Sequence, residues 1–187
     1  MRVYIVRHGK AEDYPSEAIS PGSTDLLARE PDFRRHLTGR GEAQGRFLAE
    51  RLSQTESPPE LILSSRYPRA LNTAKSIQQA VNCPLRCEAG LEVDHPVEEA
   101  LELIEREHRD GIRNLMLVGH NPQLGELIAV LASGLSPQQM ILKTGELVAL
   151  EFRSGKMIGG SKIIGRLRQC PDAKDESIVD GVFLTAH

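Results

Sequence analysis

The fold is decided near the start of the chain by the stretch Val3-Tyr4-Ile5-Val6-Arg7-His8-Gly9, where an apolar run ends in polar residues. β-Branched residues are frequent in this run, which is typical of a strand buried on both faces of a parallel sheet. Two later runs have the same form, at residues 61–65 and 114–118. Each is followed by apolar residues at helical spacing, over 68–81 and 122–132. This alternation of strands and helices predicts an α/β fold.

The rest of the chain adds elements around this core. Apolar spacing predicts helices over 38–54 and 97–108, a short segment around residue 85, and strands over 147–152 and 157–168. The last two strands flank Ser154-Gly155, so they are expected to form a hairpin at a sheet edge. We therefore expect a three-layer α/β/α sandwich with a mostly parallel central sheet. It forms a single domain over 1–187, and the tail after about residue 154 has an unassigned role.

Composition excludes several classes of protein. The 187 residues are 40% hydrophobic and 4% aromatic with no Trp, and their formal net charge is −3. These values exclude a disordered chain and argue against stacking platforms or a general attraction to nucleic acid or anionic lipid. The start of the chain does not resemble a signal peptide, and no stretch reaches 18 apolar residues. Three cysteines without zinc-site spacing indicate a reducing compartment and no metal, so we expect a cytoplasmic protein.

Each of the three buried strands ends in residues suited to bind an anion. The ends read Arg7-His8-Gly9, Ser64-Ser65-Arg66-Tyr67-Pro68-Arg69 and Gly119-His120-Asn121-Pro122. The carboxyl ends of parallel strands share one edge of a sheet, where α/β proteins place their ligands. Arginines and histidines without obvious carboxylate partners are costly to gather unless an anion neutralises them, and they repel metal cations. The sequence therefore predicts a phosphate site.

Two further features of these strand ends agree with that prediction. Gly9 lets the backbone approach a bound oxyanion, and Pro122 suits a first helical turn whose free amides face the same anion. A neutral imidazole is also a nucleophile, and a cationic surrounding favours the approach of a phosphoryl group. Phosphoryl transfer is therefore the chemistry that these residues favour.

The same motifs resemble those of the histidine phosphatase superfamily, also called phosphoglycerate mutase-like. The resemblance rests on Arg7-His8-Gly9, on Ser65-Arg66-Tyr67-Pro68-Arg69-Ala70 followed by Thr73-Ala74, and on Val118-Gly119-His120-Asn121-Pro122. It covers roughly residues 1–153. Segments 7–12, 37–41 and 143–147 are further similar to the short SixA-like branch, the phosphohistidine phosphatases. The resemblance implies a phosphoglycerate mutase-like fold and a metal-independent phosphatase without a cofactor.

The resemblance also implies roles for individual residues. His8 is expected to be the nucleophile that forms a covalent phosphohistidine, while Arg7 and Arg69 hold the transferring phosphoryl group. His120 is expected to donate a hydrogen bond to an equatorial phosphoryl oxygen. Further substrate contacts are expected from neighbouring positions, namely Gly9, Arg66 and Asn121.

The sequence departs from the ester-cleaving members of the family at the general acid. Those members resemble one another in an acidic residue after the helix of the second motif, and the candidates here are Glu92 and Asp94. Neither residue is followed by a Gly-x-Trp-Glu-Gly type of sequence, and the chain has no Trp. An imidazole leaving group needs less help, because its other nitrogen can take a proton before the P–N bond breaks. This favours phosphohistidine as the substrate.

The expected function is therefore hydrolysis of phosphohistidine on a phosphorelay-type protein through a covalent enzyme intermediate. Two alternatives stay open: a phosphatase for a small phosphomonoester or polyphosphate, and a phospho-ligand binding module with little turnover. Neither nucleic acid nor a membrane is an expected partner.

A polar stretch with several Pro and Gly residues occupies 10–35. It predicts a long surface loop that either forms a lid over the substrate or carries a short helix. Its charged residues are typical of a solvated surface: Glu12, Asp13, Glu17, Asp25, Arg29, Glu30, Asp32, Arg34 and Arg35. The histidines outside the motifs are expected to have no catalytic role: His36, His95, His108 and His187.

Overall fold

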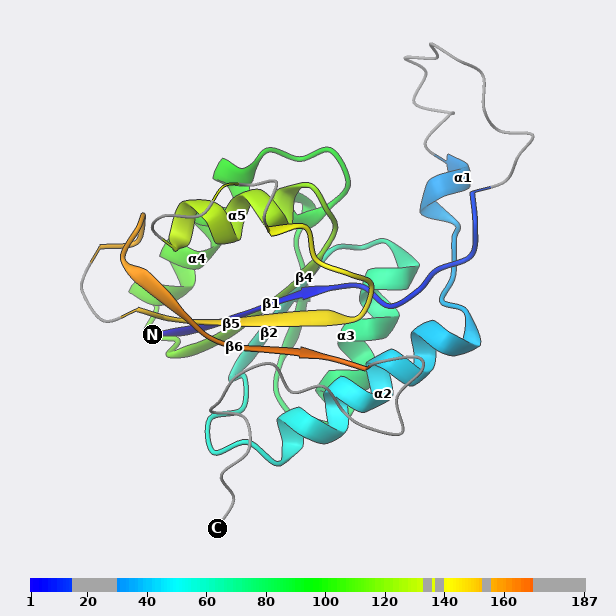
Figure 1. Ribbon diagram of the computed structural model, residues 1–187, viewed down its shortest axis with the longest axis horizontal. Coiled ribbons are helices and arrows are strands. Elements are labelled where there is room, and N and C mark those ends of the chain that lie inside the picture. Colours follow the sequence, from blue (N-terminus) through cyan, green and yellow to red (C-terminus); the bar gives the residue numbers. More distant parts are fainter. Residues whose placement is uncertain (15–29, 133–135, 137–139, 153–155, 170–187) are drawn as a thin grey trace.

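A mixed six-stranded sheet lies at the centre of the computed structural model, which describes residues 1–14, 30–132, 136, 140–152 and 156–169 (Figure 1). The strand order is β3-β2-β4-β1-β5-β6. The strands are β1 (Arg2–Arg7), β2 (Leu61–Ser64), β3 (Leu85–Cys87), β4 (Asn114–Gly119), β5 (Glu146–Phe152) and β6 (Ser161–Arg168). The first four in chain order pair in parallel, while β5 and β6 are antiparallel to their neighbours.

Helices cover both faces of the sheet, α4 and α5 on one and α2 and α3 on the other (Figure 1). The helical elements are α1 (Glu30–Phe33), α2 (Gly39–Ser53), α3 (Pro68–Val81), η3 (Ala89–Leu91), α4 (Val97–Arg109) and α5 (Gln123–Leu131). Strand β1 shows why two layers of helices are needed. Val3 and Ile5 enter the core under α4 and α5, whereas Tyr4 and Val6 enter the core over α2 and α3. Because all four are fully buried, both faces must be covered, and the predicted three-layer sandwich is confirmed.

Local signals in the sequence set most element boundaries. Helix α2 begins after Thr38, whose hydroxyl accepts a hydrogen bond from the Gly41 N–H, and α3 begins at Pro68. The edge hairpin of β5 and β6 is antiparallel as predicted, but β6 begins at Ser161 instead of residue 157. Gly159 has a φ of 63° and its N–H donates to the Val130 carbonyl, so this segment is a turn.

Parts of two predicted features lie outside the described residues. The turn Ser154-Gly155, most of the 10–35 loop and the chain after residue 169 are among them. The last part of that loop carries a short helix, α1, which is one of the two alternatives predicted for the loop. In the segments that the structure describes, none of the helices combines the length and apolar character of a membrane span.

The register of the parallel strands brings their carboxyl ends to one edge. Arg7 at the end of β1 pairs with Gly119 at the end of β4, and Ser64 at the end of β2 pairs with Val118. The residues that follow continue the pairing, because the His8 N–H donates to the Gly119 carbonyl over 3.2 Å. The Ser65 N–H similarly donates to the Val118 carbonyl over 3.0 Å. All three sequence motifs therefore meet at one edge of the sheet.

Candidate active site

Two histidines from different strand ends face one another at this edge. The ring centroids of His8 and His120 are 5.0 Å apart, and the residues are only 6% and 4% exposed. Arg69, in the first turn of α3, is 3% exposed. The structure thus brings together the four residues that the sequence singled out as catalytic, since Arg7 directly precedes His8.

The His8 ring is held in one tautomer. Its Nδ1 lies 2.7 Å from the Gly9 carbonyl oxygen, which can only accept a hydrogen bond, so Nδ1 carries the proton. Burial lowers the pKa of His8 to about 3. The hydrogen bond to Gly9 raises this pKa, whereas the charges of Arg69, Arg7 and Arg35 lower it. At neutral pH the ring is therefore uncharged, and its Nε2 lone pair is available as a nucleophile.

The His120 ring is also neutral and is held by a serine. Burial lowers the pKa of His120 to about 2, and the neighbouring His8 ring and the cations Arg69, Arg7 and Arg35 act in the same direction. Its Nε2 lies 2.9 Å from the Ser65 hydroxyl, which also accepts a hydrogen bond from the Tyr67 N–H. The serine hydroxyl can donate to Nε2, and in that tautomer the buried, unpartnered Nδ1 of His120 is a hydrogen-bond donor. The Tyr67 ring packs against His120 edge-on at 5.1 Å.

The two arginines are held by neighbouring residues of the connecting segments. Arg7 Nη1 donates to the Leu142 carbonyl over 2.8 Å, and Arg69 lies over the Tyr67 ring with its guanidinium carbon 4.7 Å from the ring centroid. Burial lowers the pKa of both arginines, yet guanidinium groups remain charged in proteins. Within the part of the chain that the structure describes, the buried Nε atoms of Arg7 and Arg69 have no hydrogen-bond partner. These are donors suited to phosphoryl oxygens.

Sequence reasoning missed two residues of the 10–35 loop and wrongly placed them on a solvated surface. The Asp32 carboxylate pairs with Arg69 and with Arg35, both over 2.7 Å, and its side chain is only 20% exposed. Arg35 lies close enough to lower the pKa of both His8 and His120. The expectation that the arginines lack carboxylate partners is also wrong, because Asp32 of this loop pairs with Arg69. The spacing of Asp32 and Arg35 was a weak signal, since such pairs are common on exposed surfaces.

Gly9 has a different role from the one expected. Its N–H is not directed at an anion but donates to the Thr73 hydroxyl over 3.1 Å, and that hydroxyl donates to the Arg69 carbonyl. A Cβ at Gly9 would lie 2.5 Å from the carbonyl oxygen of Gly41. The glycine therefore permits close packing against the start of α2, and Thr73 ties the His8 loop to the turn that carries Arg69.

The lesser candidates lie at the rim or support the site. Asn121 Nδ2 donates to the Leu142 carbonyl, the same oxygen that accepts from Arg7, so Asn121 helps to orient that arginine. Arg66 is exposed and forms an ion pair with Glu92, which occupies both side chains. Asp94 is exposed and has a φ of 65°.

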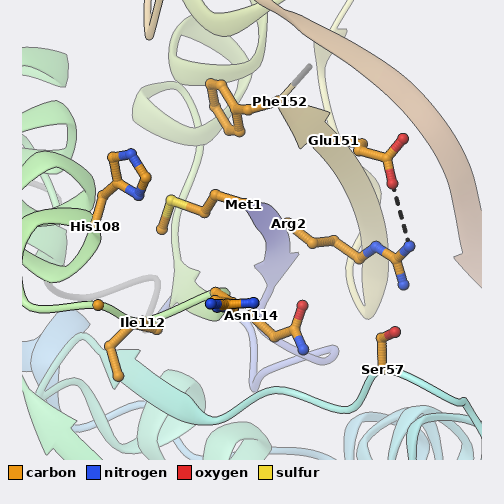
Figure 2. A pocket seen from close by; sticks show the side chains of 10 residues that line it. Met1, Arg2, Ser57, His108, Ile112, Asn114, Glu151 and Phe152 are labelled. Atoms are coloured by element: carbon orange, nitrogen blue, oxygen red, sulfur yellow. Dashed lines mark hydrogen bonds and ion pairs between the residues drawn. The ribbon is translucent and has the colours of Figure 1, made fainter. Parts of the chain in front are cut away.

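A cavity of about 540 Å³ lies elsewhere, at the amino end of β1 and β4 (Figure 2). Met1, Arg2, His108 and Glu151 line it, and Arg2 pairs with Glu151, its neighbour on the adjacent strand β5. It contains none of the motif residues. Among the residues with described positions, no group of three or more His, Cys, Asp or Glu side chains could hold a metal ion.

Comparisons with known proteins agree with the sequence motifs. The model of the histidine phosphatase superfamily (branch 1) matches residues 3–93. An uncharacterised protein of Picosynechococcus is 32% identical over 156 residues, which cover 83% of this chain and 86% of the relative. The phosphohistidine phosphatase SixA homolog of Haemophilus influenzae is 29% identical over 151 residues, covering 73% of this chain and 80% of that protein.

A solved structure shows that the architecture is shared as well. The protein histidine phosphatase SixA complexed with tungstate superposes with a TM-score of 0.72 at 22% identity, covering 90% of this chain and 97% of that one. The chain therefore belongs to branch 1 of the histidine phosphatase superfamily, in which it is SixA-like.

Proposed function

We propose that this protein hydrolyses phosphohistidine on a protein substrate through a covalent phosphohistidine at His8. The observation that carries the proposal is the His8 ring itself. Its Nδ1–H is committed to the Gly9 carbonyl, and its neutral Nε2 stands beside a second imidazole and a cluster of guanidinium groups. A buried, neutral and oriented imidazole in a cationic field is what nucleophilic attack on phosphorus requires.

The charge of the site matches a phosphoryl group. Arg7, Arg35 and Arg69 bring three positive charges that act on His8, while both imidazoles are neutral. Asp32 cancels one of these charges through its two ion pairs. Glu146 also acts on Arg7, and the positive charge that remains favours an anionic phosphoryl group.

The reaction has two steps. In the first, His8 Nε2 forms a bond to phosphorus as the P–N bond to the substrate breaks, and the substrate imidazole, protonated on its other nitrogen, leaves as a neutral ring. In the second, water attacks the phosphorus, the bond to His8 breaks, and phosphate and a proton are released. His120 Nδ1–H, set by Ser65, stabilises the equatorial oxygens in both steps. Arg7 and Arg69 keep the phosphoryl group in line with the attacking nitrogen.

The surroundings favour phosphohistidine over a phosphoester. An alkoxide leaving group needs a general acid, but Glu92 is held by Arg66 and Asp94 is exposed at the rim. An imidazole leaving group needs no such acid. Relatives that carry the phosphohistidine phosphatase name, such as the protein of Haemophilus influenzae, support the same substrate class.

The test follows the labelled phosphoryl group. The wild-type protein is mixed with a ³²P-phosphohistidine protein, quenched rapidly, and analysed for acid-labile label on the enzyme. Label is expected on the wild type and on His108→Ala, which changes an exposed histidine, but not on His8→Ala. Full turnover by His8→Ala would refute the mechanism. Rates on p-nitrophenyl phosphate and polyphosphate over pH 5–9 test the substrate class, because a preference for either would refute phosphohistidine as the substrate. Binding without turnover would show a phospho-ligand module.

A further inference from the structure

The Asp32 carboxylate lies between two arginines beside the two histidines. Its Oδ2 accepts from Arg69 Nη2 and its Oδ1 accepts from Arg35 Nη1, each over 2.7 Å. The Asp32 carbonyl oxygen adds a third bond, from Arg69 Nη1 over 2.6 Å. One residue thus fixes the positions of two guanidinium groups relative to each other.

The contacts on Arg69 leave one of its two donor faces unused. A guanidinium group offers an end-on pair of donors, Nη1 and Nη2, and a side-on pair, Nε and Nη2. Asp32 takes the end-on pair with its carbonyl and carboxylate oxygens. The buried Nε, on the side-on face, has no partner in the described residues. Asp32 therefore leaves the side-on donors of Arg69 uncommitted.

The segment that carries Asp32 is attached to the protein on both sides. The Phe33 ring packs edge-on against Tyr67 at 5.0 Å, and Tyr67 in turn packs against His120. Behind Asp32, Arg35 Nε donates to the Glu12 carbonyl, and Ala11 bridges to Leu37. These contacts place the carboxylate at a fixed position beside the two arginines.

From these contacts we infer that Asp32 is a positioning residue, which holds Arg69 and Arg35 in the geometry that binds the phosphoryl group. The inference rests on the proposed phosphoryl-transfer function but does not depend on which phosphorylated molecule is the substrate. A competing role is that Asp32 occupies the phosphate position and must leave. The contacts that anchor the segment on both sides of Asp32, Phe33 against Tyr67 and Arg35 against the Glu12 carbonyl, favour the positioning role.

The two roles predict opposite changes in oxyanion binding, so the test measures tungstate affinity by calorimetry together with kcat and KM. For Asp32→Asn, which keeps the shape but loses the charge, we expect tungstate to bind about 5- to 10-fold more weakly. A loss of about 10- to 100-fold in kcat is expected as well, because small displacements of positioning groups are costly in phosphoryl transfer. Asp32→Glu, which retains a carboxylate, should recover part of both losses.

Two controls separate positioning from a structural effect. Asp13→Asn removes a carboxylate at the exposed start of the same loop and should leave kcat, KM and tungstate affinity unchanged. In an Arg69→Ala background, Asp32→Asn should lower kcat by less than about 5-fold, because most of its effect on kcat passes through Arg69. If Asp32 had a purely structural role, Asp32→Asn and Arg69→Ala would lower kcat independently, and Asp32→Asn would lower the melting temperature.

Each other outcome overturns the inference. Tighter tungstate binding by Asp32→Asn would show that the carboxylate competes with the anion, and unchanged kcat and affinity would show that Arg69 needs no such support. The proposed function fails separately. Wild-type protein that bound tungstate but left phosphohistidine intact would refute the substrate, while the affinity ratios would still decide the role of Asp32.

Discussion

At the amino end of the sheet, Arg2 pairs with Glu151 in a cavity open to water (Figure 2), whereas at the carboxyl end Arg69 lies buried beside two neutral histidines. Arg2 and Glu151 are 21% and 34% exposed, so solvent screens them. A bare guanidinium Nε occurs at both ends, on Arg2 as well as on Arg69. What distinguishes the two ends is therefore buried excess charge, and neither cavity size nor a single unpartnered donor marks the active site.

Of the changes that test this comparison, replacing Arg69 at the carboxyl end is expected to have the largest effect. Arg69→Ala should lower kcat/KM by roughly 10³-fold, about 4 kcal/mol of transition-state stabilisation, because it removes a buried donor to the phosphoryl group. Folding should be unaffected, since the substitution also relieves repulsion with Arg7 and Arg35. Steady-state kinetics and thermal unfolding check both expectations. The control is Arg46→Ala on α2, where the side chain is 68% exposed. Unchanged turnover would remove Arg69 from the site.

A smaller effect concerns stability and pH. The pKa values of His8 and His120 are lowered from 6.5 to about 3 and about 2, mainly by burial. Between pH 6.5 and 3 the unfolded chain therefore binds more protons than the folded protein, so the free energy of unfolding falls as pH falls. Each histidine contributes up to about 1.4 kcal/mol per pH unit in this window.

Replacing one of the two histidines sharpens this prediction. His120→Asn should flatten the dependence of the free energy of unfolding on pH below 6.5, as measured by urea titrations at several pH values. Equal slopes in wild type and His120→Asn would show that His120 is accessible to protons in the folded protein.

The same comparison shows what the sequence could predict. Arg7, His8 and His120 directly follow or end buried apolar strands, so strand periodicity and the rules of parallel sheets place them together. Asp32 and Arg35 lie in a polar segment without periodicity. Asp32 contacts Arg69 of α3 and Arg35 contacts Asp32 and the Glu12 carbonyl, and only the folded chain brings these residues together. Their spacing is equally typical of exposed pairs, so it did not distinguish the two cases.

Gly9 illustrates a different limit of sequence reasoning. A missing Cβ permits a close approach, but it does not say whether an anion or another backbone makes that approach. In this protein the backbone of Gly41, at the start of α2, makes the close approach to Gly9. The role of Ser65 was also hidden, because a serine at a strand end is common and only the three-dimensional structure places its hydroxyl 2.9 Å from His120.

The smallest expected effect lies at the amino end. A double-mutant cycle of Arg2→Ala and Glu151→Ala should give a coupling energy below about 1 kcal/mol, because the pair is 3.3 Å apart and partly exposed. The kcat/KM of either variant should stay within about twofold of wild type, since neither residue touches the carboxyl-end site and distant sites act independently. Urea unfolding gives the coupling, and kinetics on the same preparations give the rates. A loss of tenfold or more in rate would mean that both ends of the sheet serve one function, and the contrast between screened and buried charge would no longer identify the active site.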